Sequence, residues 1–485
     1  NKGQPLRRLL LCEVRLASGF KHIKFIPMKS KGMMALLSAM TAMLPLAAQG
    51  EPVESSKMPG GDEVVYEVGA LEFVRTTPEL EAILKKARPQ EPKMETPKFA
   101  IRSRGNKFVL SIGGKVNPIM GYDIGNDLYN SDGGGIDFIT GDIPVPPQPG
   151  KKGAFFINPL NGYIDFTVVG LGGTKNQISA YFKLGTNGSS HGMVLKRAFV
   201  TWRNVTAGET QTLLQDGDAV QPPTIDPQGP CGDVGATAYQ VAYKSPSYNG
   251  FRFAVGLEMP TFYSSEGYYR GKDFSHDFYD VKVTDDASQV IPDVPAWVEY
   301  EGSENNRVRV SGILRNFAYR DLIDGKTRHL AGWGVQLSGN FSFWKPLVFN
   351  FQGIYGRGIG NYLQDISGRP LSFTPKDSKV GSMEANPMMG LVFGASYTPT
   401  NKLQFNAVGS YSRIWGVGDY ANVDDLNGVA GEANYRCATY VAANCFYSIT
   451  PYLKWGIEYL YGRRDTWTLG GANDHRVQTQ IAFTF

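Results

Sequence analysis

The sequence predicts an all-β protein: a transmembrane, up-and-down antiparallel β-barrel of about sixteen strands, with a short N-terminal periplasmic segment before it. Three observations predict this fold. Apolar and polar residues alternate in run after run between Phe108 and Phe485, as they do in strands with lipid on one face and water on the other. The connections between these runs are alternately short and long. The chain also ends in a strand that closes on an aromatic residue.

The last eleven residues, His475 to Phe485, carry the alternation most clearly. Their length suits a tilted membrane crossing of about 9–11 residues. Taken alone, the segment also fits an ordinary strand of a soluble sandwich. A terminal aromatic is typical of the closing strand that the barrel-assembly machinery of the bacterial outer membrane reads. We therefore predict that Ile481, Phe483 and Phe485 form that signal.

Composition narrows the function classes. The 485 residues contain 57 glycines and only 19% charged residues, and the body of the chain has no apolar run long enough for a membrane helix. A net charge of +4, without basic clusters set among aromatics, argues against nucleic acid as a partner. No Cys or His cluster has metal-ligand spacing, so neither a metal nor a cofactor is predicted.

The front of the chain reads as targeting sequence. Residues 1–27 are basic, contain no Met and are interpreted as an upstream or artefactual segment. Residues 28–50 have the basic start, apolar stretch and small terminal residues of a signal peptide. Residues 51–106 are charged and contain several prolines, which indicates a periplasmic N-terminal segment. One short helix is predicted there, with Thr77 as its N-cap and Pro78 at its first position.

Residues 107–485 are assigned to the barrel. Its predicted strands are Phe108–Met120, Tyr163–Val169, Gln177–Leu184, Val194–Trp202, Ala207–Thr212, Gly235–Lys244, Phe251–Glu258, Pro295–Tyr300, Arg307–Phe317, Ala331–Phe343, Leu347–Tyr355, Met388–Tyr397, Leu403–Tyr411, Ala438–Tyr447, Leu453–Tyr461 and the closing strand.

The connections alternate in length. Short connections such as Lys345–Pro346 and Thr450–Tyr452 alternate with long ones such as Asp123–Asn161 and Gly356–Asn386. Bacterial barrels have an even strand count, tight periplasmic turns and long external loops. A soluble sandwich has no reason to collect its long loops at one end. The alternation therefore favours a barrel with its C-terminus on the periplasmic side.

A barrel of about sixteen strands is wide enough to leave an aqueous channel. The candidate constriction is an inward loop over residues 213–234, which is rich in proline and acid and follows the fifth strand. The residues predicted to form the constriction are Asp216, Asp218, Pro222, Pro223, Thr224 and Asp226. A plain external loop is the alternative that composition leaves open.

Strand parity places several charged residues on the face opposite the apolar one. They are Arg197, Arg203, Arg252, Arg309, Arg315 and Arg476, with Lys454 and Glu458 on the same inward face and partly neutralising each other. Facing lipid, an arginine would cost roughly 2–4 kcal/mol at the midplane, so a lumenal position is expected. Two roles stay open for these arginines: attracting anionic solutes, or bracing the acidic loop.

Several motifs resemble those of the DcaP-like porin family. They are the run from Lys196 to Trp202, then Ala207 to Thr212, then Asp216, Pro222 to Asp226 and Gly229-Pro230, with the strand ends Gly353–Tyr362 and Gly456–Arg464. The resemblance covers Lys107 to Phe485. It implies a trimeric sixteen-stranded porin, with this loop folded inside, that admits small anions such as dicarboxylates. Gln211 and Leu214 stand where the family usually has Trp and Phe, and the family's periplasmic coiled coil is not evident.

The predicted function is a non-enzymatic outer-membrane porin for small hydrophilic solutes, favouring anions. Outer-membrane lipid and lipopolysaccharide, the assembly machinery and two further copies of the chain are the expected partners. A structural or adhesive barrel with a plugged lumen is one alternative. A barrel hydrolase is another, but the five histidines are not accompanied by a GxSxG motif. Ser275-His276-Asp277 is a triad only in sequence order, whereas catalytic triads assemble in space.

Overall fold

The computed structural model describes residues 64–485 except 69–70, 90–96, 98, 127, 129–135, 148–152, 160, 188–189, 218–221, 261–269, 273–277, 283–287, 303–305, 370, 376–381 and 419–433. The predicted signal peptide, residues 28–50, and the segment before it therefore lie outside the described residues, as does Asp218.

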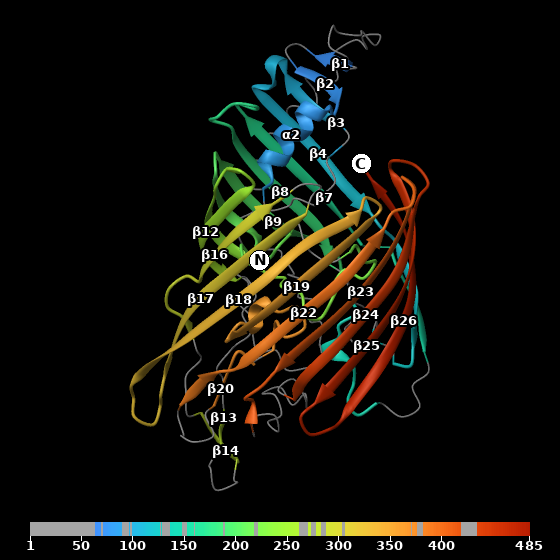
Figure 1. The fold of residues 1–485 in the computed structure, drawn as a ribbon. Coiled ribbons are helices and arrows are strands. Elements are labelled where there is room, and N and C mark those ends of the chain that lie inside the picture. The colour runs from blue at the N-terminus through green and yellow to red at the C-terminus, as the bar shows by residue number, and fades with distance from the viewer. Residues whose placement is uncertain are drawn as a thin grey trace, which may run out of the picture.

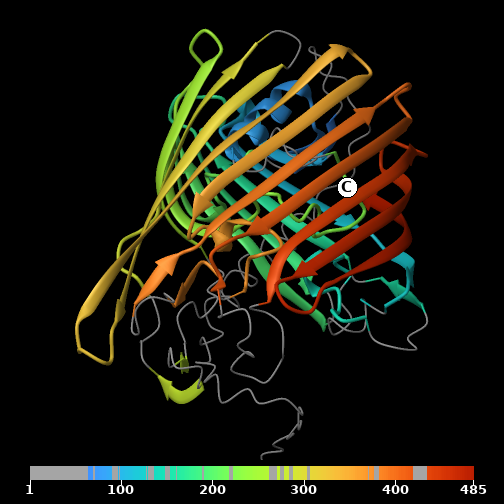
Figure 2. The ribbon, with the colours of Figure 1, turned by 60° about the horizontal axis from the view of Figure 1, so that its bottom comes forward.

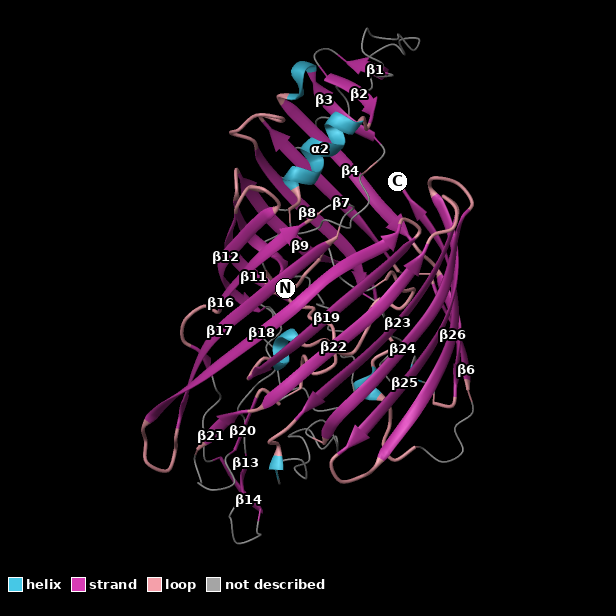
Figure 3. Cartoon of the chain, in the orientation of Figure 1, coloured by secondary structure: helices cyan, strands magenta, loops and turns pink. Residues whose placement is uncertain are grey.

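The chain forms a closed antiparallel barrel of sixteen strands, which confirms the predicted fold class (Figures 1 and 3). Each strand pairs with its neighbours in sequence, and β26 (Gly471–Thr484) closes the barrel on β5 (Ile119–Ile124) and the end of β4 (Phe108–Val116). The remaining barrel strands are β6 (Ala154–Asn158), β7 (Gly162–Gly170), β8 (Ile178–Asn187), β9 (Ser190–Trp202), β10 (Val205–Gln211), β11 (Thr237–Lys244), β12 (Phe251–Pro260), β16 (Val294–Glu301), β17 (Arg307–Arg320), β18 (Thr327–Trp344), β19 (Leu347–Arg357), β22 (Pro387–Tyr397), β23 (Leu403–Ile414), β24 (Tyr435–Ser448) and β25 (Leu453–Thr466).

The first two barrel positions differ from the prediction. The run predicted as one strand from Phe108 to Met120 is interrupted at Pro118, which has no N–H for the ladder, and β4 and β5 lie on either side of it. Their partner is likewise divided into β6 and β7. The connection predicted over 123–161 therefore contains a strand of its own.

Smaller elements lie in the long connections. β13 (Arg270–Lys272) pairs with β14 (Phe278–Lys282), β15 (Ser288–Gln289) extends the sheet beside β17, and β20 (Phe373–Pro375) pairs with β21 (Met383–Ala385). Among the described residues there are also three single turns of 3₁₀ helix: η1 (Arg104–Asn106), between β3 (Phe99–Ser103) and β4, η2 (Thr140–Asp142) and η4 (Gly360–Tyr362). The last two help to fill the barrel (Figure 3).

The barrel carries its apolar residues outside. On β12, Phe253 is 50% exposed and its neighbour Ala254 only 2%, and the same alternation continues through Leu257 and Glu258. A soluble protein would bury the larger apolar side chains instead. This reversed pattern suits an exterior in contact with lipid chains.

Aromatic side chains gather at both ends of the wall. At the short-turn end the Trp344 and Tyr397 rings lie 5.6 Å apart. Toward the long loops, the Tyr355 ring lies 6.0 Å from Trp333 and 6.4 Å from Trp415. Two such belts are expected at the two membrane–water interfaces.

The N-terminal segment continues the sheet instead of forming a separate lead-in. β3 (Phe99–Ser103) pairs with β4 along the edge that β26 leaves uncovered, and β2 (Leu71–Arg75) and β1 (Val64–Val68) follow. An unpaired strand edge invites association with other chains, and these strands cover this one.

The predicted helix is present as α2 (Pro78–Ala87). The Thr77 side chain accepts a hydrogen bond from the N–H of Leu80 at 3.3 Å, as an N-cap does. Its apolar face packs on Val109 and Val169, which point into the barrel from β4 and β7. No helix among the described residues is long and apolar enough to cross a membrane.

Candidate channel and its inward loop

The segment 213–234 lies within the barrel, where the structure describes it. At its start, the N–H of Leu213 donates to Glu258 at 3.0 Å, and Glu258 points inward from β12. Asp216 then accepts from the guanidinium of Arg307 at 2.7 Å and from the Ser338 hydroxyl at 2.6 Å. Because these partners belong to the lumenal face of β17 and β18, the chain enters the lumen here.

Arg307 and Arg309 share two carboxylates, Asp216 on the loop and Glu299 on β16. Arg309 lies 2.6 Å from Glu299 and 3.3 Å from Asp216, and Arg307 binds the same two acids. Burial acts to raise the pKa of Asp216, but Arg309 and Arg307 outweigh burial and hold that pKa below its usual value. The cluster fastens the start of the loop to the wall.

The middle of the loop is held by Glu458 on β25. Its two carboxylate oxygens accept the backbone N–H groups of Ile225 and Asp226 at 2.9 and 2.8 Å. The amides of Asn444 and Gln478 donate to the same carboxylate at 2.8 and 2.9 Å. A buried carboxylate with four donors is a strong local clamp, because ionised acceptors make the shorter and stronger hydrogen bonds.

Asp226 is a second buried clamp. Its carboxylate accepts from the N–H of Phe138, in another long connection, and from the Tyr440 hydroxyl of β24, both at 3.0 Å. Burial, with the nearby Asp137 carboxylate, raises the pKa of Asp226 to about 8. Asp226 therefore joins two inward segments to the wall.

The loop then returns along β22 to β24. The N–H of Gly232 donates to the Ser410 hydroxyl at 2.8 Å, and the Cys231 sulfur lies 3.6 Å from that hydroxyl. Pro222 packs so closely on β22 that a Cβ at Gly394 would lie 2.3 Å from its Cδ. Pro223 and Thr224 border the cavity described below.

Apolar residues also occupy the long-loop half of the lumen. A buried cluster joins inward-facing wall residues such as Ile354, Val392 and Leu460 to loop residues such as Phe138 and Leu363. Inward apolar positions depart from the polar lumen of a simple porin. They are accounted for here by the segments around η2 and η4, which pack on them. Figure 2 shows the barrel with this long-loop end turned forward.

Two predicted arginines lie deep in this packed region. Arg315 donates to Asp293 at 2.9 Å and to Asn361 at 3.1 Å. Arg476 is fully buried, is bidentate on Asp123 and donates to the carbonyl of Ile136 at 2.7 Å. Both hold inward segments against the wall, and neither lines the two cavities that follow.

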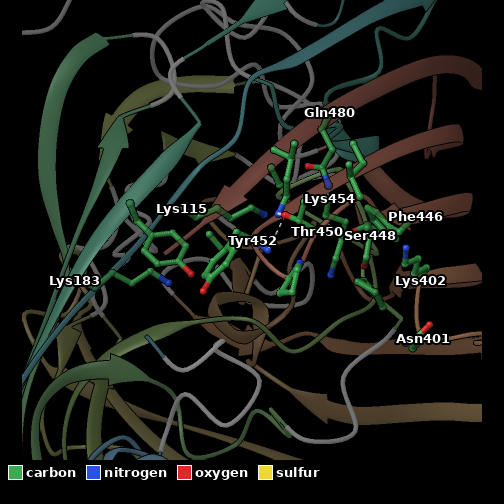
Figure 4. Close-up of a pocket in the computed structure, with 18 of the residues that line it drawn as sticks. Lys115, Lys183, Asn401, Lys402, Phe446, Ser448, Thr450, Tyr452, Lys454 and Gln480 are labelled. Carbon is green, nitrogen blue, oxygen red and sulfur yellow. Dashed lines mark hydrogen bonds between the residues drawn. The ribbon is translucent and has the colours of Figure 1, made fainter. Parts of the chain in front are cut away.

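The first cavity lies on the short-turn side of the inward loop and has a volume of about 900 Å³ (Figure 4). Four lysines line it, and there is no carboxylate among its described lining residues: Lys115, Lys183, Lys402 and Lys454. Gln215 and Thr224 of the loop form one boundary. Lys183 also lies 4.4 Å from the centre of the Tyr163 ring.

The second cavity, of about 650 Å³, is also at the short-turn end. Three of the predicted residues line it: Arg203, Arg252 and Arg309. Arg252 also donates a hydrogen bond to Glu299. Arg203 donates to Asn176 of the adjacent turn at 2.7 Å. Arg197 is placed elsewhere: it lies on β9 and donates to the Thr237 hydroxyl at 2.7 Å.

Sequence reasoning identified Lys454 but missed Lys115, Lys183 and Lys402 as members of one site. The signal for Lys115 was available, since it alternates with outward Gly114 and Val116 on β4. Lys183 likewise shares the inward parity of Tyr181 on β8. Only the closed ring, however, brings these strands to the same cavity as the turn that carries Lys402.

The predicted assembly signal lies at the barrel seam. Ile481 and Phe483 face outward, and the backbone of Phe485 pairs with Gly114 through hydrogen bonds of 3.2 and 3.0 Å. A Cβ at Gly114 would lie 2.5 Å from the Phe485 ring, so the close approach requires glycine.

The residues of the hydrolase alternative are dispersed. His475 belongs to the outer aromatic belt, with its Nδ1 2.6 Å from the Tyr459 hydroxyl. Ser275, His276 and Asp277 lie outside the described residues. In the described ranges no group of three or more His, Cys, Asp or Glu side chains is arranged to hold a metal.

No protein-family model and no curated protein matches the sequence. Solved structures match the fold. The outer membrane channel DcaP of Acinetobacter baumannii aligns with a TM-score of 0.60 over 79% of this chain and 99% of that chain, at 16% identity. The chain has the fold of a DcaP-like porin. This confirms the resemblance at the level of the fold.

Two further porins match this DcaP-like fold less closely. The anion-selective porin from Comamonas acidovorans has a TM-score of 0.47 and 10% identity, over 78% of this chain and all of that chain. OmpF of Salmonella typhi has a TM-score of 0.44 and 11% identity, over 78% of this chain and 98% of its own.

Proposed function

We propose that this DcaP-like barrel forms a diffusion channel in the bacterial outer membrane for small hydrophilic solutes, and that it favours anions such as dicarboxylates. One observation carries the proposal: the cavity between the short turns and the inward loop is lined by four lysines without a described carboxylate. Like charges in a low-dielectric cleft raise the local concentration of solutes of opposite sign. The name of the similar DcaP structure, an outer membrane channel, supports the same function.

The arginines differ from the lysines of the first cavity in burial, since all four lysines are partly or fully exposed. Arg307, Arg309, Arg315 and Arg476 are buried in ion pairs with carboxylates. A buried guanidinium that is already paired with a carboxylate offers little charge to a passing solute. We therefore assign bracing to these arginines and anion preference to Lys115, Lys183, Lys402 and Lys454.

The reversal potential of single channels in a KCl gradient tests this assignment. The wild type is expected to favour chloride over potassium, and Lys115→Gln/Lys183→Gln/Lys454→Gln to lose most of that preference. The matched control is Lys345→Gln/Lys326→Gln, whose lysines lie in exposed turns outside the lumen. A wild-type channel that prefers potassium, or a triple variant that keeps its preference, contradicts the proposal.

A barrel with a plugged lumen is a second candidate, because a buried apolar cluster fills the long-loop half of the interior. Such a barrel would have a structural or adhesive role. Purified protein in planar bilayers distinguishes the two: steady conductance steps support the channel, and an electrically silent bilayer containing folded barrel supports the plug.

Assembly as a homotrimer is part of the proposal and is drawn from the resemblance to DcaP-like porins. The mass of the detergent-solubilised protein tests it. A species of three chains is expected, and a monomer at all concentrations would contradict this part alone.

A further inference from the structure

The helix α2 lies on the inner face of the barrel wall at its short-turn end. Its backbone carbonyls at Ile83 and Ala87 accept hydrogen bonds from Gln177 and Ser179, at 3.1 and 3.3 Å. Ser179 and the neighbouring Tyr181 are buried on the lumenal side of β8. The N-terminal segment is therefore built into the mouth of the barrel.

The residues after α2 extend this contact across the mouth. Arg88 is 2% exposed, lies 3.5 Å from Asp165 of β7 and stacks 6.0 Å from the centre of the Tyr181 ring. The carbonyl of Pro89 accepts from the ammonium of Lys244 at 2.8 Å, at the end of β11. The segment thus connects the walls formed by β7 and β11.

Between this segment and the wall lies the second cavity, of about 650 Å³. Its described lining contains eight basic residues and one acidic residue, Glu301: the basic ones are Lys85, Lys86, Arg88, Arg203, Lys244, Arg252, Arg307 and Arg309. Glu299 and Asp216 stand behind three of the arginines, Asp165 lies beside Arg88, and Glu81 pairs with Lys85. These acids neutralise part of the charge. Basic groups still outnumber these acids.

Arg88 gives an independent indication of a ligand. Its Nη1 atom forms the ion pair with Asp165, whereas its Nε atom is buried and makes no hydrogen bond to the described residues. A buried donor without an acceptor is destabilising, and more so when it is charged. An anion in the adjoining cavity, through a carboxylate or phosphate oxygen, would supply the missing acceptor for Nε.

We propose that this cavity is a second anion-binding site, at the short-turn mouth, with Lys86 and Arg88 of the N-terminal segment on one side and Lys244 of the wall on the other. Its ligands are small doubly charged anions that carry carboxylate or phosphate groups. The site extends the proposed anion channel, so that a solute would meet two basic regions in succession.

Binding is measured on the full chain in detergent by calorimetry at 0.15 M salt, with succinate and inorganic phosphate as separate probes. This readout does not depend on conductance. The wild type is expected to bind at least one probe, and Lys86→Gln/Lys244→Gln to bind it at least about tenfold more weakly, since two charge-assisted hydrogen bonds are lost. Succinate and phosphate arms together distinguish carboxylate from phosphate preference.

Arg88→Gln is the second variant, and heat-modifiable migration on gels verifies that it has folded. Its affinity should also fall. Lys345→Gln/Lys326→Gln is the matched control and should bind as the wild type does.

Absence of binding to the wild type overturns the second site, as does unchanged affinity in both folded variants. The lysine variants of the first cavity should lose anion selectivity and still bind the probe at this site. That result would support both proposals. A channel that prefers potassium while the protein still binds succinate or phosphate would overturn the proposed function and not this site.

Discussion

At the scale of single residues, similar cations have different surroundings. Arg476 is fully buried and bidentate on Asp123, whereas Lys115 and Lys183 border an open cavity. A planar guanidinium suits fixed pairing with a carboxylate, and a flexible ammonium suits a solvated passage. Charge alone therefore did not distinguish a buried, paired cation from one that borders a cavity.

The Arg476–Asp123 pair makes a quantitative prediction about stability. Arg476→Ala should lower the free energy of unfolding by about 3–5 kcal/mol, because it leaves a buried carboxylate without its partner. The double variant Arg476→Ala/Asp123→Ala should recover part of that loss. Denaturant titration in detergent, read as a double-mutant cycle, measures the coupling. A double variant as unstable as the sum of the two single ones would show that the pair is not coupled.

Asp226 makes a prediction about pH. In an opened loop its pKa would return toward 3.8, whereas in the closed loop it is about 8. Between these values the closed loop binds more protons, so the closed loop is favoured at low pH and loses this advantage as the pH rises to about 8. Ionisation would then place its charge beside Asp137 and Glu458, with Arg476 and Tyr440 as the nearby polar groups.

Single-channel recordings from pH 6 to pH 9 measure this effect. Current fluctuations from loop opening should become more frequent above pH 7 in the wild type. Asp226→Asn has no charge to titrate and should show no such trend. Fluctuations that increase equally in both proteins would assign the pH response to another group.

At the scale of elements, the inward loop depends on a few polar clamps more than on its own sequence. Where the structure describes residues 213–234, their backbone makes no strand of its own. The loop is held by Glu258, Glu458 and Ser410 of three different strands. Backbone N–H groups inside a protein need acceptors, and these side chains supply them. The proline content stiffens the loop but does not position it.

Cys231 reports on this loop. Burial raises the pKa of its thiol to about 12, and the thiol is nearly inaccessible. Thiol reagents should therefore react slowly with the wild type, since the thiolate is the reactive form. Glu458→Ala removes acceptors from two loop N–H groups and should accelerate labelling of Cys231 about tenfold or more.

Mass spectrometry of the labelled peptide identifies the reacting cysteine. Glu458→Gln keeps one acceptor and should lie between the two proteins. If Cys231 in Glu458→Ala reacts as slowly as in the wild type, Glu458 does not hold the loop.

At the scale of the whole molecule, closure decides which residues meet. β26 joins the first strands of the barrel, and residues more than 350 positions apart become neighbours, as Arg476 and Asp123 do. Closure also removes the free sheet edge that a membrane would not tolerate. The N-terminal strands also remove a free edge, because β3 pairs with the part of β4 that β26 does not reach.

The closing strand carries a prediction about assembly. Phe483→Ala/Phe485→Ala should reduce the fraction of heat-modifiable, folded barrel in outer-membrane preparations several-fold, because it removes the terminal aromatics and the ring that packs on Gly114. Phe343→Ala is the control, since Phe343 is an aromatic exposed near a short turn and remote from the seam. Equal assembly of the closing-strand variant and this control would remove the predicted role of the terminus.

The sequence by itself determined the class of fold, because alternate residues of a membrane barrel strand face lipid and the lumen and are therefore alternately apolar and polar. Every predicted barrel strand has a counterpart, and the helix that begins after Thr77 is present, since alternation and capping are local properties. The break at Pro118 was also local and could have been read from the missing N–H.

Only the tertiary structure decided how the interior is used. Parity placed Arg315, Arg476 and Lys454 inside but could not choose their partners, which come from distant connections such as those of Asp293 and Ile136. The four lysines of the first cavity and the seating of α2 in the mouth depend equally on contacts between remote segments. Strand periodicity fixes which face a side chain takes, whereas the neighbour it meets there depends on barrel closure and on loops that have no period of their own.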